Sequence, residues 1–134
     1  PEAFCVNFVA KLKSVILVRI GEEARLPRLF YDFKQGVRLC MQFDWDPTKA
    51  ERNHQKHGVE FKEAITAFND PHAMIMEDPA HSQHEERFLV LGLSERYRVL
   101  VVVFVERVQD RLRIISARLA TAHERRLYET STYR

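Results

Sequence analysis

The chain has 134 residues, 46% of them hydrophobic and 30% charged, a balance typical of a folded domain and not of a disordered segment. This length suits one domain and is too short for two ordinary ones. The formal net charge is only +2, so any affinity for nucleic acid must come from local clusters of basic residues.

Cysteine use and hydropathy give an expectation about the compartment. Cys5 and Cys40 form no zinc-binding pattern and are too few for a disulfide framework, so we expect a reduced chain in the cytoplasm. The apolar run SVILVRIG at residues 14–21 is too short to cross a bilayer, and the N-terminus lacks the features of a signal peptide. We therefore expect no membrane contact.

The chain changes character at Met41, its first methionine. Residues 1–40 carry a formal charge of +3, whereas residues 41–134 carry −1 and hold all six histidines. Residues 1–40 are thus either a genuine N-terminal extension that covers the domain or upstream sequence translated from a misplaced start. We favour the second interpretation, with a domain at residues 41–134, and limited proteolysis would separate the two.

The first half of this domain predicts one strand and two helices. Residues 41–46, MQFDWD, alternate aromatic and polar side chains, as a short strand does. Asp46 followed by Pro47 is a typical helix start and Gly58 a typical end, so we expect a helix over residues 47–57, polar almost all round and on the surface. A second helix is expected over residues 59–70, where apolar side chains recur every three or four residues before Pro71 ends it.

The second half predicts strands and a final helix. Strand-like runs occur at residues 72–77, 87–93, 98–107 and 111–117, and the last three are joined by connections short enough for hairpins. The run at 98–107 is apolar on both faces and suits a central strand. Thr121 and Glu124 form a capping box that begins the last helix. The order predicts an α+β domain, a mostly antiparallel sheet of about five strands with two helices after the first strand and a C-terminal helix.

Arginine is unusually frequent in the body of the chain, with eleven arginines against three lysines after residue 40. The planar guanidinium group matches phosphate oxygens and stays charged when partly buried. Strand ends from adjacent hairpins lie side by side, so four arginines could converge on one edge or face of the sheet: Arg87, Arg107, Arg113 and Arg118. The alternative is that these arginines are solvated or paired with nearby carboxylates, those of Glu85, Glu86, Glu106, Asp110 and Glu124.

Histidines occur in two close pairs, His54 with His57 and His81 with His84. Such spacings can bind a metal, but no third ligand follows at a diagnostic distance, so we expect no metal site. A single histidine is a better candidate for proton transfer because the imidazole titrates near neutrality. His57 could instead be a helix C-terminal residue favoured by the helix dipole. No glycine-rich phosphate loop and no nucleophile elbow occur, so we expect no cofactor.

Together these motifs resemble the BrnT family of toxins from Phe43 to Glu129. The resemblance is carried by the segments FDWDPTKAERNHQKHGVEFKEAITAFNDP, DPAHSQHEERFLVLGLS, VLVVVFVER and RIISARLATAHERRLYE. Residues 1–40 match nothing in the family, which supports a misplaced start. Glu60 stands where the family often has a serine or similar cap, and this departure affects the expected boundary of the second helix.

The resemblance implies a compact RelE-like fold and a ribonuclease toxin of a type II toxin–antitoxin system. It also implies a BrnA-type antitoxin as partner, a ribbon-helix-helix DNA-binding protein that neutralises the toxin in a hetero-oligomer. Operator DNA would then be contacted only through the antitoxin. The competing class is a non-catalytic module that binds protein or nucleic acid through the same arginines.

Metal-independent cleavage of RNA requires that a 2′-OH attack the neighbouring phosphate while fixed cations stabilise the developing charge. We expect Arg118, at the junction of the last strand and the last helix, to contact that phosphate, with the other three arginines nearby. His57 is the candidate for proton transfer, and Tyr128 is a candidate acid or hydrogen-bond donor. Substrate binding is expected from Lys56, Arg125 and Trp45. A core position is the alternative for the tryptophan, which could otherwise stack on a base.

Overall fold

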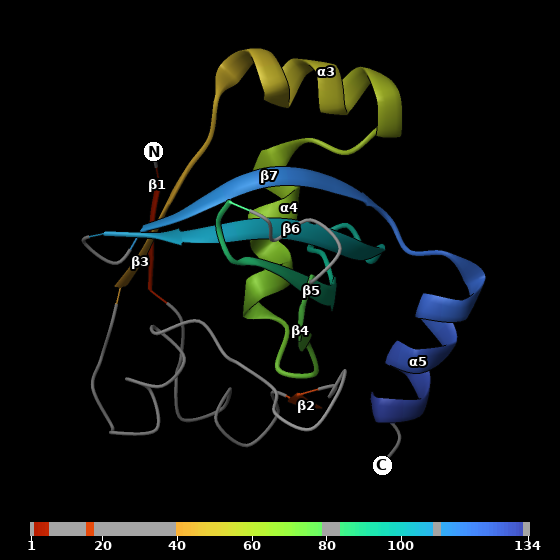
Figure 1. Ribbon diagram of the computed structural model, residues 1–134. Helices are drawn as coiled ribbons and strands as arrows, with labels where there is room; N and C mark the ends of the chain where they lie inside the picture. Colours follow the sequence, from red (N-terminus) through yellow and green to blue (C-terminus); the bar gives the residue numbers. More distant parts are fainter. Residues whose placement is uncertain (1, 6–15, 18–39, 79–83, 109–110, 133–134) are drawn as a thin grey trace.

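The computed structural model describes residues 2–5, 16–17, 40–78, 84–108 and 111–132. Its strands are β1 (Glu2–Cys5), β2 (Ile16–Leu17), β3 (Cys40–Asp44), β4 (Met74–Glu77), β5 (Arg87–Leu93), β6 (Val99–Arg107) and β7 (Arg111–Leu119). Its helices are α3 (Pro47–His57), α4 (Phe61–Ala64), the 3₁₀ helix η1 (Ile65–Asn69) and α5 (Ala122–Thr132). Figure 1 shows α3 and α4 following β3, and α5 beyond the end of β7.

The strands form one sheet in the order β1-β3-β7-β6-β5-β4-β2. β6 lies between β5 and β7 and pairs antiparallel with both, while β3 joins β7 in parallel. The central place of β6 explains why its sequence is apolar on both faces. The five strands from Cys40 onward and the order of the helices confirm the predicted α+β class and the mostly antiparallel sheet.

Two short segments of residues 1–40 pair with this sheet. β1 is antiparallel to β3 at one edge, and β2 is parallel to β4 at the other. β3 begins at Cys40 and therefore crosses the boundary expected at Met41. Most of residues 1–40 lie outside the described part of the chain, so the interpretation of this segment stays a prediction.

One face of the sheet packs against α4 and η1 and holds the main hydrophobic core. The rings of Phe43 and Phe104 both meet the ring of Phe68 edge to face, with centroids 4.9 and 5.1 Å apart. All three side chains are fully buried. A Cβ atom at Gly92 would lie 2.8 Å from the carbonyl oxygen of Ala67, so glycine allows η1 to approach β5 closely.

The helix ends follow the local signals of the sequence. Asp46 caps α3 by accepting a hydrogen bond from the backbone N–H of Thr48 at 2.8 Å, and Gly58 ends the helix with a φ of 69°. At α5, the Glu124 side chain accepts from the Thr121 N–H at 2.7 Å, and the Thr121 hydroxyl accepts from the Glu124 N–H at 3.2 Å. The predicted capping box is therefore confirmed.

The second helix is shorter than predicted. A single helix over residues 59–70 was expected, whereas α4 gives way to the 3₁₀ helix η1 at Ile65. Glu60 precedes α4 without a side-chain capping hydrogen bond, as its departure from the family pattern implied. The Thr66 hydroxyl donates to the Glu63 carbonyl oxygen at 2.6 Å, a contact that bends helices.

The other face of the sheet carries a second, smaller core beneath α5. Its buried members are Met74, Met76, Leu91, Val101, Ala120 and Tyr128. The Tyr128 hydroxyl donates a 2.6 Å hydrogen bond to the Asp70 carboxylate, which anchors α5 to the end of η1. In the described ranges, every helix is too short or too polar to cross a membrane.

Candidate active site

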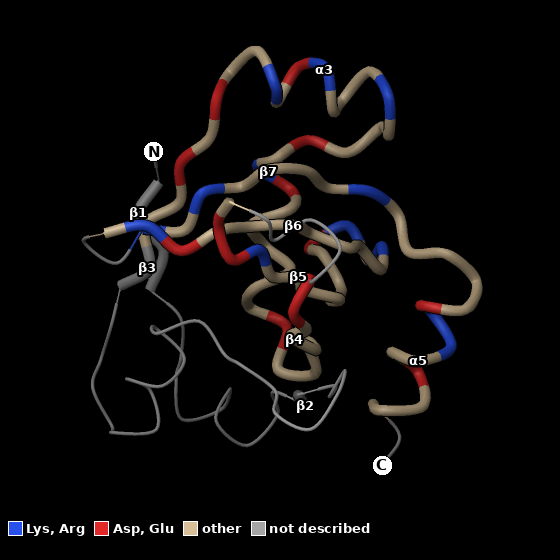
Figure 2. The backbone as a smooth tube through the Cα atoms, in the orientation of Figure 1, with Lys and Arg blue, Asp and Glu red and all other residues tan. Residues whose placement is uncertain are grey.

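The four predicted arginines project from the same face of the sheet, the one that carries α5. In the register of the strands, Val105 lies opposite Arg87 on one side and Arg113 on the other. Val101, four residues earlier on β6, lies opposite Arg118. Four residues of strand span about 13 Å, so the arginines form two groups at separate positions on this face. Figure 2 shows basic positions toward both ends of β7.

A β-bulge places Arg113 and Arg118 on the same face. These residues are five apart, and simple alternation would send them to opposite faces of the sheet. The register shifts between Val103 and Phe104, so that Ile115 is an extra residue on β7. The bulge reverses the alternation in the second half of β7, so that the Arg118 side chain lies on the same face as Arg113. We call this face the arginine face. It comprises Arg87, Arg107, Arg113 and Arg118, with Leu89, Val103, Ile115 and Ser116 between them.

The first group, Arg87, Arg107 and Arg113, lies near carboxylates. Glu85 lies 3.2 Å from the Arg107 guanidinium and 4.0 Å from that of Arg87. The Arg113 Nε atom lies 3.7 Å from Asp44 Oδ1, which is longer than a hydrogen bond. The Arg113 side chain is 40% exposed and, within the described residues, donates no hydrogen bond. Its guanidinium therefore keeps donors for a phosphate group.

Arg118 is held firmly by Glu124. Both Nη atoms donate to this carboxylate at 2.8 Å, and Nη1 also donates to the Leu119 carbonyl oxygen at 3.2 Å. The hydrogen bond from Arg118, with further bonds from Thr121, lowers the pKa of Glu124 to about 2. The same hydrogen bond raises the pKa of the Arg118 guanidinium, so the pair is ionised at all physiological pH values.

The pair leaves one fork of the Arg118 guanidinium open. Glu124 occupies the fork formed by the two Nη atoms, and Leu119 takes the other hydrogen of Nη1. Among the described contacts, the Nε–H and the second hydrogen of Nη2 have no acceptor. These two point in parallel along the side of the guanidinium plane and can bind two phosphate oxygens together. Arg118 can therefore hold Glu124 and a phosphate group at the same time.

The four predicted arginines share one face of the sheet, but the other three do not lie close to Arg118 as expected. Arg118 alone lies beside α5, and the others lie near the opposite end of the face. The spacing follows from the strand rise, since a hairpin brings residues together across the sheet but not along it. The pairing with Glu85 and Glu124 agrees with the alternative that carboxylates satisfy these arginines, and Asp44 is an additional partner.

Asn53 connects α3 to the strand that carries Arg118. β3 pairs with β7 only as far as Arg113, so the later part of this β7 edge lacks a strand partner among the described residues. The buried Asn53 side chain replaces one, accepting from the Ala117 N–H at 3.1 Å and donating to the Ala117 carbonyl oxygen at 2.8 Å. It also donates to the Val59 carbonyl oxygen at 3.1 Å.

Two predicted site residues lie at this end of α3. His57 and Lys56 come between Asn53, which binds the backbone of Ala117, and Val59, whose carbonyl oxygen accepts from the Asn53 side chain. His57 is half-buried and Lys56 is exposed. Asn53 thereby holds the end of α3 beside the C-terminal part of β7, and Val59 packs into the main hydrophobic core.

Three other predicted residues lie away from the arginine face or are otherwise engaged. Trp45 is half-buried, packs against the main core and meets the Phe61 ring edge to face at 6.0 Å, which agrees with the alternative of a core position. The Tyr128 hydroxyl already donates to Asp70, which gives this residue a structural role. Arg125 is exposed on α5, one residue after Glu124.

A buried ion-pair network escaped the sequence analysis. Glu63 is 2% exposed and binds the Arg98 guanidinium through both carboxylate oxygens, while the Ser94 hydroxyl donates to it at 2.7 Å. Burial alone would raise the pKa of Glu63, but the hydrogen bonds from Arg98 and Ser94 outweigh it and lower the pKa. The signal that could have revealed Glu63 is its place among apolar residues of a helix, where a carboxylate needs a partner.

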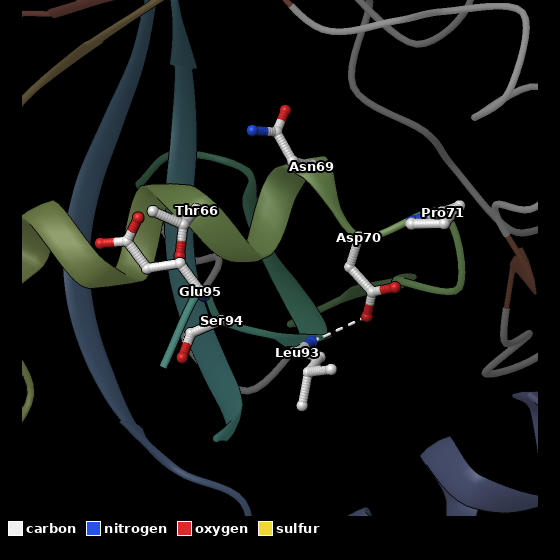
Figure 3. A pocket seen from close by; sticks show the side chains of 7 residues that line it. All are labelled: Thr66, Asn69, Asp70, Pro71, Leu93, Ser94 and Glu95. Carbon is white, nitrogen blue, oxygen red and sulfur yellow. Dashed lines mark hydrogen bonds between the residues drawn. The ribbon is translucent and has the colours of Figure 1, made fainter. Parts of the chain in front are cut away.

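A shallow pocket of about 330 Å³ lies between the end of η1 and the end of β5 (Figure 3). Asp70 lines it, and its carboxylate accepts hydrogen bonds from the backbone N–H groups of Leu93 and His72 as well as from Tyr128. Glu95 lines the same pocket. Two carboxylates oppose the binding of phosphate, so this pocket is not the candidate active site.

No metal-binding site competes with the arginine face as candidate active site within the described ranges. No group of three histidine, cysteine or acidic residues there could hold a metal ion. His54 lies 3.9 Å from Glu60 on the helix surface. His81, one member of the second histidine pair, lies outside the described residues.

Comparisons with known proteins identify the family. The family model for "Ribonuclease toxin, BrnT, of type II toxin-antitoxin system" matches residues 45–124, more than half of the chain. A crystal structure of the ribonuclease toxin BrnT from Brucella abortus is similar at 23% identity and a TM-score of 0.46, over 60% of this chain and 97% of that one. Curated protein sequences give no match.

Proposed function

Since this chain belongs to the BrnT family of ribonuclease toxins of type II toxin–antitoxin systems, we propose that its arginine face cleaves RNA without a metal ion, by attack of a ribose 2′-OH on the adjacent phosphate. The observation that carries this proposal is the open fork of Arg118. A guanidinium fixed by Glu124 and still able to bind two phosphate oxygens is preorganised for the charge that develops in the transition state.

We assign the remaining steps to other residues of the chain. Arg113, with donors available, binds a flanking phosphate group and sets the course of the strand across the face. Half-exposed side chains of Val103 and Ile115 form an apolar floor between the two phosphate sites. His57 transfers the proton of the 2′-OH, and Lys56 and Arg125 add positive charge at the rim.

A protein partner follows from the same family assignment. The family is a component of a two-protein system, so we propose a BrnA-like antitoxin that neutralises the toxin in a hetero-oligomer and alone contacts operator DNA. We also propose that the toxin acts in the cytoplasm, where its RNA substrates occur. Co-expression with a small neighbouring gene that encodes a ribbon-helix-helix protein should abolish growth inhibition.

The test is cleavage of a defined RNA by the purified protein in the presence of EDTA. We expect products with cyclic-phosphate ends, because the attacking oxygen belongs to the RNA itself. Arg118→Ala should lose cleavage by on the order of 100-fold or more. Arg118→Lys should lose nearly as much, since it keeps the charge but not the fork. The matched control is Arg126→Ala, an exposed arginine on α5.

The competing class, a non-catalytic binding module, predicts a different result. It would bind RNA or protein through the arginine face without turnover and without cyclic-phosphate ends. Full activity in a folded Arg118→Ala protein would reject the assignment of the phosphate to Arg118. Dependence of cleavage on added Mg²⁺ would reject the metal-independent mechanism and leave the ribonuclease assignment of the family intact.

A further inference from the structure

The tip of the β5–β6 hairpin presents an exposed tyrosine in a strained backbone conformation. Tyr97 has a φ of 60°, the left-handed region that glycine and asparagine enter readily and bulky residues avoid. Its side chain is 86% exposed, so packing in the described structure does not compensate for the strain. Strain of this kind persists where the surroundings impose it and occurs often at binding sites.

Hydrogen bonds around Ser94 impose this conformation. The Ser94 hydroxyl donates to the buried Glu63 and accepts from the Arg96 N–H at 3.2 Å, while the backbone N–H of Tyr97 donates to the Ser94 carbonyl oxygen at 2.9 Å. Arg98, the residue after Tyr97, is fixed by the same carboxylate. The tyrosine ring therefore projects from a rigid turn.

We infer that Tyr97 is a stacking platform for an unpaired base of the RNA substrate, with Arg96 beside it as a phosphate contact. This inference rests on the proposed function and adds a second binding position to it. An aromatic ring offers a flat face to any nucleobase, and stacking of this kind contributes to the binding of single strands irrespective of sequence. The Arg96 side chain is 58% exposed, and its Nη1 atom lies 3.9 Å from Glu63 Oε1, which is too long for a hydrogen bond. Its guanidinium donors can therefore bind RNA.

The position of the tip relative to Arg118 supports a shared substrate. The backbone N–H of Ala120 donates to the Val99 carbonyl oxygen at 2.9 Å, which brings the start of β6 beside the end of β7. Val101 lies opposite Arg118, and Tyr97 is four residues earlier in the chain. The tip thus lies at the end of the sheet that carries Arg118, about 13 Å further along by the rise of a strand. A short single-stranded segment can reach both.

The scarcity of apolar side chains at the tip favours RNA over a protein partner. A protein interface has several apolar side chains at its centre. The neighbours of Tyr97 at the tip are Glu95 and Arg96, both charged and exposed. A single exposed ring beside the basic side chain of Arg96 suits a base and its phosphate better than an apolar protein surface.

Three variants separate stacking from a structural role. Tyr97→Asn removes the ring and relieves the backbone strain, whereas Tyr97→Phe keeps both the ring and the strain. Val108→Ala is the matched control, because Val108 is an 81% exposed apolar residue beyond the other end of β6. Full-length proteins are compared for thermal unfolding, for kcat and KM on a single-stranded RNA, and for binding of the same sequence with every ribose 2′-O-methylated, which cannot cleave itself.

Stacking predicts that Tyr97→Asn raises KM and the dissociation constant by about 5- to 100-fold, as for loss of one stacked base, and changes kcat by less than about twofold. Its melting temperature should equal or exceed that of the wild type, whereas a structural tyrosine would lower it. Tyr97→Phe and Val108→Ala should behave like the wild type in RNA binding.

Unchanged binding in Tyr97→Asn would overturn the inference. Loss of antitoxin binding with intact RNA binding would also overturn it and identify the tip as a protein contact. Failure of the proposed function is distinguishable from these results. If the wild-type protein binds RNA without cleaving it and Tyr97→Asn weakens that binding, the platform stands and the catalytic proposal falls. If the wild-type protein neither binds nor cleaves RNA, both fall.

Discussion

Replacing Glu124 by glutamine isolates the ion pair that positions Arg118. Glutamine is nearly isosteric and still serves in a capping box, so the start of α5 should persist. The substitution removes the negative charge while leaving one acceptor for the guanidinium. Any change in stability or rate then reports on the ionic contact and not on the helix.

The size of the effect on stability follows from the pKa of Glu124. The shift from 4.5 to about 2 corresponds to an upper limit of about 3 kcal/mol. The Arg118 side chain is 37% exposed, so solvent screening reduces the contribution of the pair to about 1 kcal/mol. Because folding lowers this carboxyl pKa, the stabilisation is complete above pH 4.5 and is lost as the pH falls from 4.5 toward 2.

Urea unfolding of both proteins at pH 7 and pH 3 measures this contribution. We expect the wild type to exceed Glu124→Gln by about 1 kcal/mol at pH 7, and the difference to fall by about half or more at pH 3. In the cleavage assay, kcat should fall about 10- to 100-fold because Arg118 is no longer oriented, while KM should fall because the site gains net positive charge. A difference in stability that does not change with pH, or an unchanged kcat, would refute the reasoning.

Three further substitutions test other contacts. Arg98→Met leaves the buried Glu63 carboxylate without its main partner and should cost about 3–5 kcal/mol in urea unfolding; a cost below about 1 kcal/mol would mean that the pair is not buried in solution. Tyr128→Phe removes the hydroxyl that donates to Asp70 and should cost about 1–2 kcal/mol with kcat nearly unchanged, whereas a large fall in kcat at normal stability would support the expected acid role. His57→Ala should lower kcat about 10²- to 10⁴-fold and remove one limb of the pH–rate profile; an unchanged profile would exclude this histidine.

Elements with local signals were predictable from the sequence. Asp46 with Pro47, and Thr121 with Glu124, begin helices through contacts among residues two or three apart, so short segments contain the whole signal. The same applies to the runs that became β5, β6 and β7, whose hairpin connections fix their neighbours. The change from α4 to the 3₁₀ helix η1 was less predictable, because the Thr66 hydroxyl bonds to the Glu63 carbonyl oxygen at that point.

Contacts that depend on register were not predictable in the same way. Strand alternation alone would have placed Arg113 and Arg118 on opposite faces, and only the bulge at Ile115 brings them to one face. Asn53 binds Ala117 across 64 positions of the chain, and no pattern within either segment signals that pairing. The choice of arginines could thus be made from composition and strand ends, while their separation into two groups required the structure.

Arg118 and Arg113 differ in how firmly they are held, and this difference predicts distinct kinetic roles. Arg118 sits between two fixed points, since Asn53 binds the residue before it and Glu124 binds its side chain. A cation fixed in this way needs no reorganisation when charge develops, so its loss should appear in kcat. Arg113 has one contact at 3.7 Å and can follow the RNA as it binds.

Arg113→Ala should therefore raise KM with little change in kcat, and it should reduce the dependence of RNA affinity on salt concentration by about one released counterion. The measurement is KM and kcat at several salt concentrations, beside Arg118→Ala. Arg126→Ala serves as the control for a general loss of positive charge. A fall in kcat for Arg113→Ala as large as that for Arg118→Ala would show that both groups act on the same phosphate, despite the 13 Å or so of strand between them.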